Sequence, residues 1–362
     1  MIYRLVFENL KHRPVRTLLS VFAIGVEVTL ILTLVGVSRG VLSDMASRSR
    51  GTGADILIRP PESAGFSFSY TMSEKIVDLI RAKPHVAMAT GTYVKSIDSF
   101  NSITGIHLDE FNAMSGGLKI VKGRLFQGPD DLVVDEIFAK QHHNLQPGSS
   151  IDFGHSWRIS GIVEQGKLSR TFADISRMQE LYSGNGLVSA IYIKLDDPSN
   201  TDTVKAALQK EFQTYKVDSI EEFVSLFSTN SVPYIEAFTK VVIGIAVLIG
   251  FLVVCLSMYT AVLERTREIG ILKALGASPG YIVGILLRET MMLALVGTAV
   301  GILMTYGTRS LLGVFAVSFP QEIVPDWYLP VTGIALTGAI VGALYPGLRA
   351  ARQDAIEALA YD

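Results

Sequence analysis

Charged residues are scarce in this sequence of 362 residues, because Asp, Glu, Lys and Arg together make up only 18% of it. A typical soluble domain has about 25% charged residues. The formal net charge is −2, which provides no overall positive field for binding nucleic acid. The single cysteine, Cys255, lies in an apolar run and excludes a disulfide within the chain, so a domain outside the cytoplasm would have to fold without one.

Sequence motifs that bind nucleotides or metals are also missing. The chain contains no G-x-x-x-x-G-K-[ST], H-E-x-x-H or C-x-x-C, and it therefore offers no phosphate-binding loop and no zinc-binding motif of these kinds. Of the six histidines only His142 and His143 are adjacent, whereas a metal site needs further ligands that converge on one point. We predict that this chain contains no catalytic, cofactor-binding or metal-binding residues.

Long apolar runs are abundant instead. Four of them reach the length of about 20 residues that a helix needs to cross a bilayer, and we assign the spans to residues 17–37, 240–263, 282–307 and 328–348. The first run is longer than the apolar core of a signal peptide, which has about 7–15 residues, and no clear A-x-A cleavage site follows it. We interpret it as an uncleaved anchor.

Lys and Arg are distributed unevenly around these runs. They precede the first run, separate the second from the third and follow the fourth, whereas the connection between the third and fourth contains only Arg309. Because basic residues favour the cytoplasmic side, we place both termini, residues 264–281 and the tail 349–362 in the cytoplasm. Residues 38–239 and 308–327 are then outside, in a multi-pass protein of a bacterial inner membrane.

Residues 1–16 have an amphipathic pattern. Ile2, Val6 and Leu10 share one helical face, charged residues occupy the other, and Pro14 ends the pattern. We predict a helix that lies on the inner leaflet, with membrane lipid as its partner. A plain cytoplasmic tail is the alternative.

The long outside stretch is large enough for a soluble domain with its own core. A strand–helix–strand pattern occurs at each of its ends, from ADILIRPP to HVAMATGTYV and from SAIYIKLDD to YKVDSI, which favours a ferredoxin-like split βαβ fold. Short strands and turns between them predict an inserted β-rich subdomain over about residues 92–166. The predicted fold class is an α-helical membrane protein with four transmembrane helices and one large α+β extracytoplasmic domain.

A few polar or small residues inside the apolar runs are candidates for special roles. Glu27 lies midway through the first run, where a carboxylate costs about 2.5–3.5 kcal/mol. We expect it at a helix or dimer contact or on a substrate path, and a side chain without a role is the alternative. Gly297-x-x-x-Gly301 and Gly338-x-x-x-Gly342 have the spacing that lets helices pack closely, either within the chain or in a dimer.

The segment ERTREIGILKALGASPG, residues 264–280, separates the second and third runs. Its pattern places Ile269 and Leu272 on one helical face, and Gly276 occupies the position of a glycine that ends a helix. Such a helix can rest on the membrane or dock into a groove on a cytoplasmic partner. Its mixed charge favours docking, because a helix that binds only lipid is expected to be more basic.

The stretch R-x-R-E-I-G-I-L-K-A-L-G-A-S at residues 265–278 resembles the signature of the FtsX/MacB-type (type VII, mechanotransmission) ABC transporter permeases. The similarity includes RTLLS at residues 16–20, the stretch at residues 123–166 and the order of one large domain followed by three spans. This resemblance implies a homodimer or heterodimer of permeases that acts with two copies of an ATPase, which binds ATP and Mg²⁺. It also implies that ATPase closure moves the outside domains mechanically.

The resemblance assigns residue roles as well. Residues 264–281 would form the coupling helix on the ATPase, with contacts from Arg265, Glu268, Ile269, Gly270, Leu272, Lys273, Ala274, Leu275 and Gly276. The two glycines would allow close approach, and Glu268 and Lys273 would make polar contacts at the rim. No ATPase is fused to this chain, so we expect the ATPase to be a separate polypeptide. The size of the outside domain favours the exporter and lipoprotein-release branches over the cell-division branch.

The predicted function is a permease subunit, without a nucleotide site of its own, that drives export or extraction of a substrate from the periplasm or the outer face of the inner membrane. A periplasmic adaptor and an outer-membrane channel are further expected partners. The alternative is a signalling or regulatory protein that uses the same movement to control an extracellular enzyme or to sense a peptide. A structural or adhesion protein is disfavoured, because it would not need a docking helix. Peptide, lipoprotein, glycolipid and drug all stay open as substrates.

Overall fold

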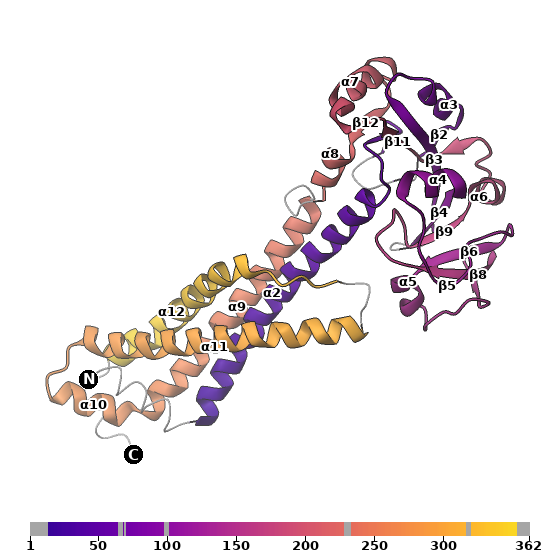
Figure 1. Cartoon of the computed structure of the whole chain (residues 1–362). Helices are drawn as coiled ribbons and strands as arrows, with labels where there is room; N and C mark the ends of the chain where they lie inside the picture. Colours follow the sequence, from indigo (N-terminus) through magenta and orange to yellow (C-terminus); the bar gives the residue numbers. More distant parts are fainter. Residues whose placement is uncertain are drawn as a thin grey trace. The chain divides into compact units, whose positions relative to one another are not determined.

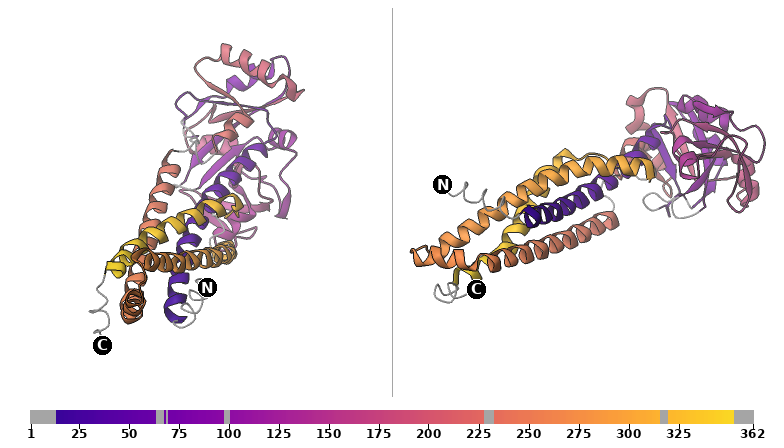
Figure 2. Two further views of the ribbon diagram at one scale, coloured as in Figure 1. Left: turned by 90° about the vertical axis from the view of Figure 1, so that its left-hand side faces the viewer. Right: turned by 90° about the horizontal axis from the view of Figure 1, so that it is seen from below.

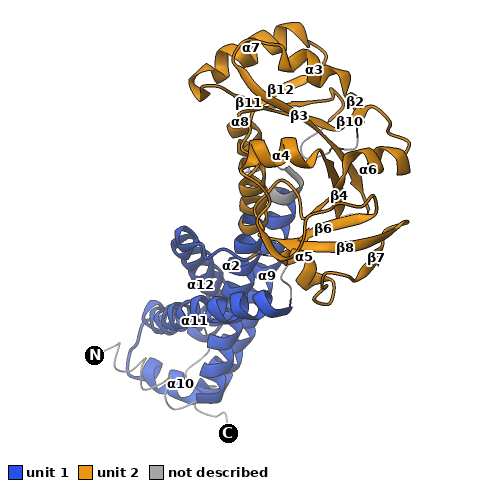
Figure 3. Cartoon of the chain, turned by 45° about the vertical axis from the view of Figure 1, so that its right-hand side comes forward, with its two compact units in different colours: residues 1–39, 234–315, 321–362 blue, residues 40–233, 316–320 orange. Residues whose placement is uncertain are grey.

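The computed structural model describes residues 14–63, 68, 70–97, 101–227, 233–315 and 320–352. The chain forms two compact units (Figures 1 and 3), a helical unit of residues 1–39, 234–315 and 321–362 and a sheet domain of residues 40–233 and 316–320. Most of the predicted amphipathic helix, residues 1–13, and the end of the tail, residues 353–362, lie outside the described residues.

Within the described ranges, four helices are long and apolar enough to cross a membrane: α2 (Pro14–Arg50), α9 (Pro233–Glu264), α11 (Pro279–Phe315) and α12 (Tyr328–Arg352). Helices α2 and α11 continue well past the predicted span limits, because hydropathy locates the apolar stretch and not the point where the helix ends. Side chains from all four helices share one apolar core. Figure 2 shows the helices in two further views. A short helix, α10 (Thr266–Ala274), connects α9 to α11.

Glycines allow α2 to pack closely on α11. A Cβ added at Gly297 would lie 2.8 Å from the Cβ of Ile24, and one at Gly301 would lie 2.6 Å from the carbonyl oxygen of Gly25. Both distances are too short for a side chain, so these positions require glycine. The hydroxyl of Thr29 adds a hydrogen bond to the carbonyl oxygen of Gly301 at 3.0 Å. This pair of glycines serves packing within the chain.

The two glycines of the second pair differ in how closely a neighbouring helix approaches them. Gly342 of α12 lies against α9, where an added Cβ would be 2.9 Å from the carbonyl oxygen of Phe251. A Cβ at Gly338 would make only an ordinary 4.0 Å contact with Val247. Of the four predicted packing glycines, Gly338 therefore has room for a methyl group, and a role of these glycines in a dimer stays a prediction.

The sheet domain contains one ten-stranded sheet in the order β12–β1–β11–β3–β4–β9–β6–β8–β5, with β7 paired to β8. Its first half is antiparallel and consists of β1 (Ile56–Arg59), β3 (Val86–Ser96), β11 (Ala190–Leu195) and β12 (Lys216–Ser219). These strands are connected by α3 (Lys75–Arg81) and α7 (Thr201–Glu211). The ferredoxin-like assignment of this half stays a prediction, because it rests on strand order alone.

The second half of the sheet lies in the sequence between β3 and β11. It consists of β4 (Ser102–Ile106), β5 (Ile120–Gly123), β6 (Asp131–Asp135), β7 (Ser150–Asp152), β8 (Ser156–Val163) and β9 (Thr171–Asp174). Helices α4 (Leu108–Ser115), α5 (Glu136–Gln141) and α6 (Ile175–Leu181) follow β4, β6 and β9. Because β9 pairs with both β4 and β6, the β-rich subdomain extends beyond residue 166.

Both halves contribute to one apolar core. Ile58 and Ile193 of the first half and Leu132 and Trp157 of the second are fully buried in the same cluster. Burial of a large apolar side chain stabilises a fold by about 1.5–3 kcal/mol. Four long apolar helices with a mixed α/β domain confirm the predicted fold class, apart from its ferredoxin-like detail.

The different surroundings of the glycines predict different responses to a methyl group. We expect Gly301→Ala to lower the stability of the helical unit by about 1–3 kcal/mol, because the added Cβ overlaps α2. Gly338→Ala is the matched control and should leave stability unchanged. Thermal unfolding of the two purified variants in one detergent measures this, and equal melting temperatures would contradict the assignment.

Candidate functional site

Helix α10 ends as its sequence predicts. Gly276 has a φ of 94°, which is a left-handed conformation that glycine adopts without strain. The N–H of Gly276 donates to the carbonyl oxygen of Lys273 at 2.9 Å, and the N–H of Ala277 donates to that of Leu272 at 2.9 Å. These two bonds form a Schellman motif, which confirms the predicted helix end.

Residues 276–280 have the spacing G-x-S-x-G of a serine nucleophile elbow. That motif requires a strand before the serine, whereas helix α10 precedes Ser278 here. The Ser278 hydroxyl instead accepts a hydrogen bond from the N–H of Tyr281 at 3.3 Å, and Pro279 is the first residue of α11. Ser278 therefore caps α11, as a hydroxyl followed by proline favours.

The nine predicted docking residues are divided between an inner and an outer side of the segment. Arg265, Ile269 and Gly270 are buried within the chain. Leu272 and Lys273 are half-buried, whereas the exposed members are Glu268, Ala274, Leu275 and Gly276. Leu275 is 81% exposed and Ile271, which was not predicted, is 46% exposed. Burial places Arg265, Ile269 and Gly270 against the chain itself. Contact of the exposed residues with an ATPase stays a prediction.

A fully buried carboxylate fixes the start of this segment. Oε2 of Glu289 in α11 lies 3.1 Å from Nη1 of Arg265, and its Oε1 lies 3.3 Å from Nη2 of Arg16 in α2. Arg16 also reaches Glu264 at 3.4 Å. Two guanidinium groups offset the cost of burying the carboxylate. The residue that precedes α10 is thus connected to α11 and α2.

Sequence reasoning missed Glu289 and Arg16 as site residues. Glu289 interrupts the apolar run LLRETMMLAL, and an acidic residue in such a run is a signal of the same kind as Glu27. Its partners could not be inferred, because Arg16 and Arg265 are 273 and 24 positions away in the sequence.

Lys273 also contacts the chain's own helices. Its Nζ donates to the carbonyl oxygen of Ala351 in α12 at 2.9 Å, and a cation near the last carbonyls of a helix is electrostatically favourable. The side chain predicted to contact a partner's rim is therefore engaged with α12. With the ion pairs of Glu289, this bond connects the α10 segment to three long helices.

An apolar groove with a volume of about 320 Å³ lies beside α10. Its walls are formed by Ala261, Arg265, Glu268, Ile269, Ile271, Leu272, Ile282, Ile285, Leu286 and Glu289. Pockets of this kind, apolar with a few charged groups, accept side chains or ligands of mixed character. The groove places a receptive surface directly beside the exposed residues of α10.

Glu27 faces another helix of the chain. It is buried in α2, and a Cβ added at Gly250 of α9 would overlap its carboxyl group. The missing side chain at Gly250 therefore makes room for the carboxyl. In the described part of the chain Glu27 has no hydrogen-bond or ion-pair partner. The helix contact is thus present, while the dimer seam and the substrate path stay predictions.

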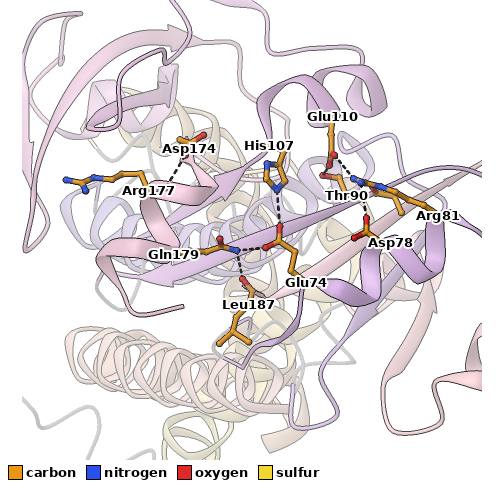
Figure 4. A network of polar contacts seen from close by, with 11 residues as sticks. Glu74, Asp78, Arg81, Thr90, His107, Glu110, Asp174, Arg177, Gln179 and Leu187 are labelled. Carbon is orange, nitrogen blue, oxygen red and sulfur yellow. Dashed lines mark hydrogen bonds and ion pairs between the residues drawn. The ribbon is translucent and has the colours of Figure 1, made fainter. Parts of the chain in front are cut away.

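A polar network in the sheet domain connects three of its helices (Figure 4). Oε1 of Glu74 lies 2.9 Å from Nε2 of His107, and the side-chain amide of Gln179 donates to Oε2 of Glu74 at 2.9 Å. Near it, Glu110 accepts hydrogen bonds from Arg81 and from Thr90. An open cleft of about 590 Å³ adjoins the network and is lined by His107, Leu108, Asp109, Glu110, Phe126, Gln127, Gly128, Pro129 and Asp174.

The C-terminal end of α2 is held by charged residues of the sheet domain. Oδ2 of Asp44 accepts a hydrogen bond from Nη2 of Arg170 at 2.9 Å and lies 3.2 Å from Nε of Arg48. Arg50 donates two hydrogen bonds, at 2.9 and 2.7 Å, to Glu221 in α8 (Ile220–Ser225). Arg170 directly precedes β9, and α8 follows β12. The last turns of α2 therefore contact both halves of the sheet.

Asp135 lies beneath this contact. Its Oδ1 accepts the N–H of Phe138 at 2.6 Å and caps α5, and its Oδ2 is 3.8 Å from Nη1 of Arg170. Burial raises the pKa of Asp135 to about 6, although the Phe138 N–H, Arg170 and Arg48 act in the opposite direction.

Two family models match the chain. The MacB-like periplasmic core domain matches residues 17–211, which is more than half of the chain, and the FtsX-like permease C-terminal domain matches residues 240–355. The second match includes α10 together with Glu289 and Ala351, which contact Arg265 and Lys273.

Curated relatives match nearly the full length of the chain. It is 25% identical over 391 residues to the macrolide export ATP-binding/permease protein MacB of Salmonella paratyphi A, covering 95% of this chain and 58% of the relative. It is 25% identical over 405 residues to the uncharacterized ABC transporter permease YknZ of Bacillus subtilis, covering 99% of this chain and 98% of that relative. The chain thus spans a little over half the length of this MacB relative.

Solved structures are similar to the sheet domain at low identity. The periplasmic region of MacB from Actinobacillus actinomycetemcomitans matches with a TM-score of 0.37 and 18% identity over 48% of this chain and 92% of that one. The extracellular domain of the transporter YknZ from Gram-positive bacteria matches with a TM-score of 0.34 and 14% identity, over 46% of this chain and 98% of that one.

The buried carboxylate of Glu289 predicts a large mutational effect. Glu289→Gln should destabilise the helical unit by about 3–5 kcal/mol, because it leaves two guanidinium groups without their shared counter-charge. Glu268→Gln, on the exposed side of α10, should have little effect. The measurement is thermal unfolding of both variants in the same detergent, and similar losses would show that the ion pairs do not hold the segment.

The raised pKa of Asp135 predicts that the sheet domain loses stability as the pH rises. The folded state binds the proton with a pKa of about 6 and the unfolded state near the ordinary value of 3.8. Stability is therefore greatest below about pH 4 for this group and falls by about 3 kcal/mol as the pH rises through 6. Asp135→Asn should abolish this loss and keep the cap, since Asn also caps helices well.

Urea unfolding of the full chain at pH 4 and pH 7, followed by Trp157 fluorescence, tests this prediction. The chain has two tryptophans, so Trp327→Phe leaves Trp157 as the only one. Asp152→Asn, at an exposed position of β7, is the control. If the free energy of unfolding of Asp135→Asn changes with pH as much as that of the parent chain, Asp135 is not responsible for the pH dependence.

Proposed function

Because the chain belongs to the FtsX/MacB-type family of ABC transporter permeases, we propose that it couples ATP hydrolysis by a cytoplasmic ATPase to a movement of its extracytoplasmic sheet domain. It is a transporter permease subunit, and its 362 residues contain no phosphate-binding loop motif. ATP and Mg²⁺ are then bound by the ATPase, at a site outside these residues.

The observation that carries this proposal is the two-sided character of the α10 segment. Its inner side is fixed to the chain through Arg265 and Lys273, which contact Glu289 and α12. Its outer side exposes Ile271 and Leu275 beside an apolar groove. An ATPase that docks on the outer side would therefore move a segment that cannot shift without its ion-paired helices.

Helix α2 offers a direct route for such a movement. It is continuous from Pro14 to Arg50, with Arg16 near its start and Asp44 and Arg50 near its end. A continuous helix of this length rises about 55 Å, at about 1.5 Å per residue. Contacts at its first turn and its last turns support mechanical coupling between the ATPase and both halves of the sheet.

The assembly and its location are part of the proposal. Two permease chains, identical or different, would act with two ATPase copies in a bacterial inner membrane, with both termini in the cytoplasm. The substrate would be exported or extracted from the outer side, with a periplasmic adaptor and an outer-membrane channel in a two-membrane cell. The relatives are named as an exporter and a transporter permease, which favours transport over the signalling alternative.

Substitution of the exposed leucine tests the docking proposal. Leu275→Asp should abolish binding of the ATPase, because it places a charge on the contact surface, and Glu268→Lys should weaken binding by reversing a charge there. The tagged chain is purified from its own membranes in mild detergent, and co-purified proteins are identified and quantified.

The matched control is Leu79→Asp, which changes another exposed leucine, in α3 of the sheet domain. We expect a stoichiometric Walker-motif protein with the parent chain and with Leu79→Asp, and its loss with Leu275→Asp. If Leu275→Asp retains the ATPase and stimulates it fully, the α10 segment is not the docking element.

A further inference from the structure

We propose that the C-terminal end of α12 binds the headgroup of an anionic phospholipid. The site is an open groove of about 440 Å³ lined by Tyr345, Leu348, Arg349 and Arg352. Arg349 and Arg352 are three residues apart on one helix, which places their side chains on the same face. The proposal concerns a ligand of the membrane itself and does not depend on the docking of an ATPase.

Arg349 is held in place in a way that leaves it free to bind an anion. Its guanidinium group lies over the ring of Tyr259 in α9, 5.3 Å from the centroid, and its Nη1 donates to the Tyr259 hydroxyl at 3.2 Å. A guanidinium group has five N–H donors in a planar fork that matches the oxygens of a phosphate. The contact with Tyr259 uses one donor and one face, so other donors stay available.

Neither arginine is neutralised by the described part of the chain. Arg349 and Arg352 are exposed and form no ion pair with a carboxylate among the described residues. This contrasts with Arg16 and Arg265, which share the carboxylate of Glu289. Among the residues that the structure describes, the lining of the groove therefore carries two positive charges and no negative charge.

The position of the groove along α12 fits a lipid headgroup. Arg349 lies about 31 Å from Tyr328 along the helix axis, at about 1.5 Å per residue, and the hydrocarbon core of a bilayer is about 30 Å thick. Trp327 and Tyr328 are aromatic residues of the type that lies at a membrane surface. If they mark one surface, Arg349 and Arg352 lie at the level of the phosphates of the other.

The lining has the mixed character of a phospholipid. Leu348 and the ring of Tyr345 are apolar and exposed beside the two guanidinium groups. A headgroup phosphate can pair with the arginines while the upper part of an acyl chain covers Leu348. Basic pockets between membrane helices bind anionic headgroups in this way, whereas a free phosphate would gain nothing from the apolar wall.

The bound lipid would lie next to the α10 segment. Ala351, whose carbonyl oxygen accepts the hydrogen bond of Lys273, stands between Arg349 and Arg352 in the sequence. A lipid phosphate would order the same turn of α12 that holds Lys273. We therefore expect anionic lipid to stabilise the contact between α12 and α10.

Native mass spectrometry of the full chain in mild detergent tests the proposal. The probes are phosphatidylglycerol and phosphatidylcholine with identical acyl chains. We expect one phosphatidylglycerol to be retained per chain, with a preference of roughly thirtyfold, since each arginine near an anionic surface contributes about a factor of five. Arg352→Gln should reduce the preference about fivefold, and the double variant with Arg349→Gln should remove it.

Arg309→Gln is the matched control, because Arg309 is also exposed near one end of a long helix but lies outside the groove. A loss in this variant equal to that in Arg352→Gln would mean a general effect of surface charge and would overturn the site. The Arg352 side chain is exposed and makes no hydrogen bond or ion pair with the other described residues, so its variant stays informative if Arg349→Gln unfolds, which a thermal melt reveals.

Inorganic phosphate distinguishes a lipid from a soluble anion. We expect millimolar phosphate to leave the bound phosphatidylglycerol in place, because it cannot replace the acyl chain at Leu348. Complete displacement by phosphate, with the same dependence on Arg352, would identify a free-anion site and overturn the lipid proposal.

Discussion

The helical unit depends on the burial of one carboxylate. Glu289 is fully buried between Arg16 and Arg265, and a charge in such a position is tolerated only when its partners are present and well placed. The three residues come from α11, from α2 and from the start of the α10 segment. Because the Glu289 carboxylate contacts both guanidinium groups, the three elements are held in one arrangement, which leaves the other side of α10 exposed.

Ion pairs hold both ends of α2, but they differ in how deeply they are buried. At the N-terminal end Arg16 meets a fully buried carboxylate, whereas at the C-terminal end Arg50 meets the exposed Glu221. Exposed pairs contribute little, about 0–1 kcal/mol, so Arg50 positions α8 more than it stabilises it. The stronger contact at this end is the partly buried pair of Asp44 and Arg170, which ties α2 to the second half of the sheet.

Elements encoded by local pattern could be predicted from the sequence. Apolar runs identified four long helices, and Gly276 with its following proline identified the end of α10. The contacts that give the site its character could not be predicted, because they join residues such as Arg16 and Glu289 that are far apart in the sequence. Likewise, Gly301 and Gly338 each belong to a G-x-x-x-G motif, and the sequence predicts close helix packing at both. The distance to the neighbouring helix shows that Gly301 requires glycine and that Gly338 does not.

The arginines that predict membrane orientation have roles that only the structure distinguishes. A count of basic residues treats Arg16, Arg265, Arg349 and Arg352 as equivalent. The first two are engaged with Glu289 and are no longer available to a lipid phosphate or a partner. The last two are exposed at the end of α12, with one of them oriented by Tyr259. The same residue type therefore holds helices together at one position and offers a binding surface at another. The difference lies in whether a described carboxylate is close enough to form an ion pair.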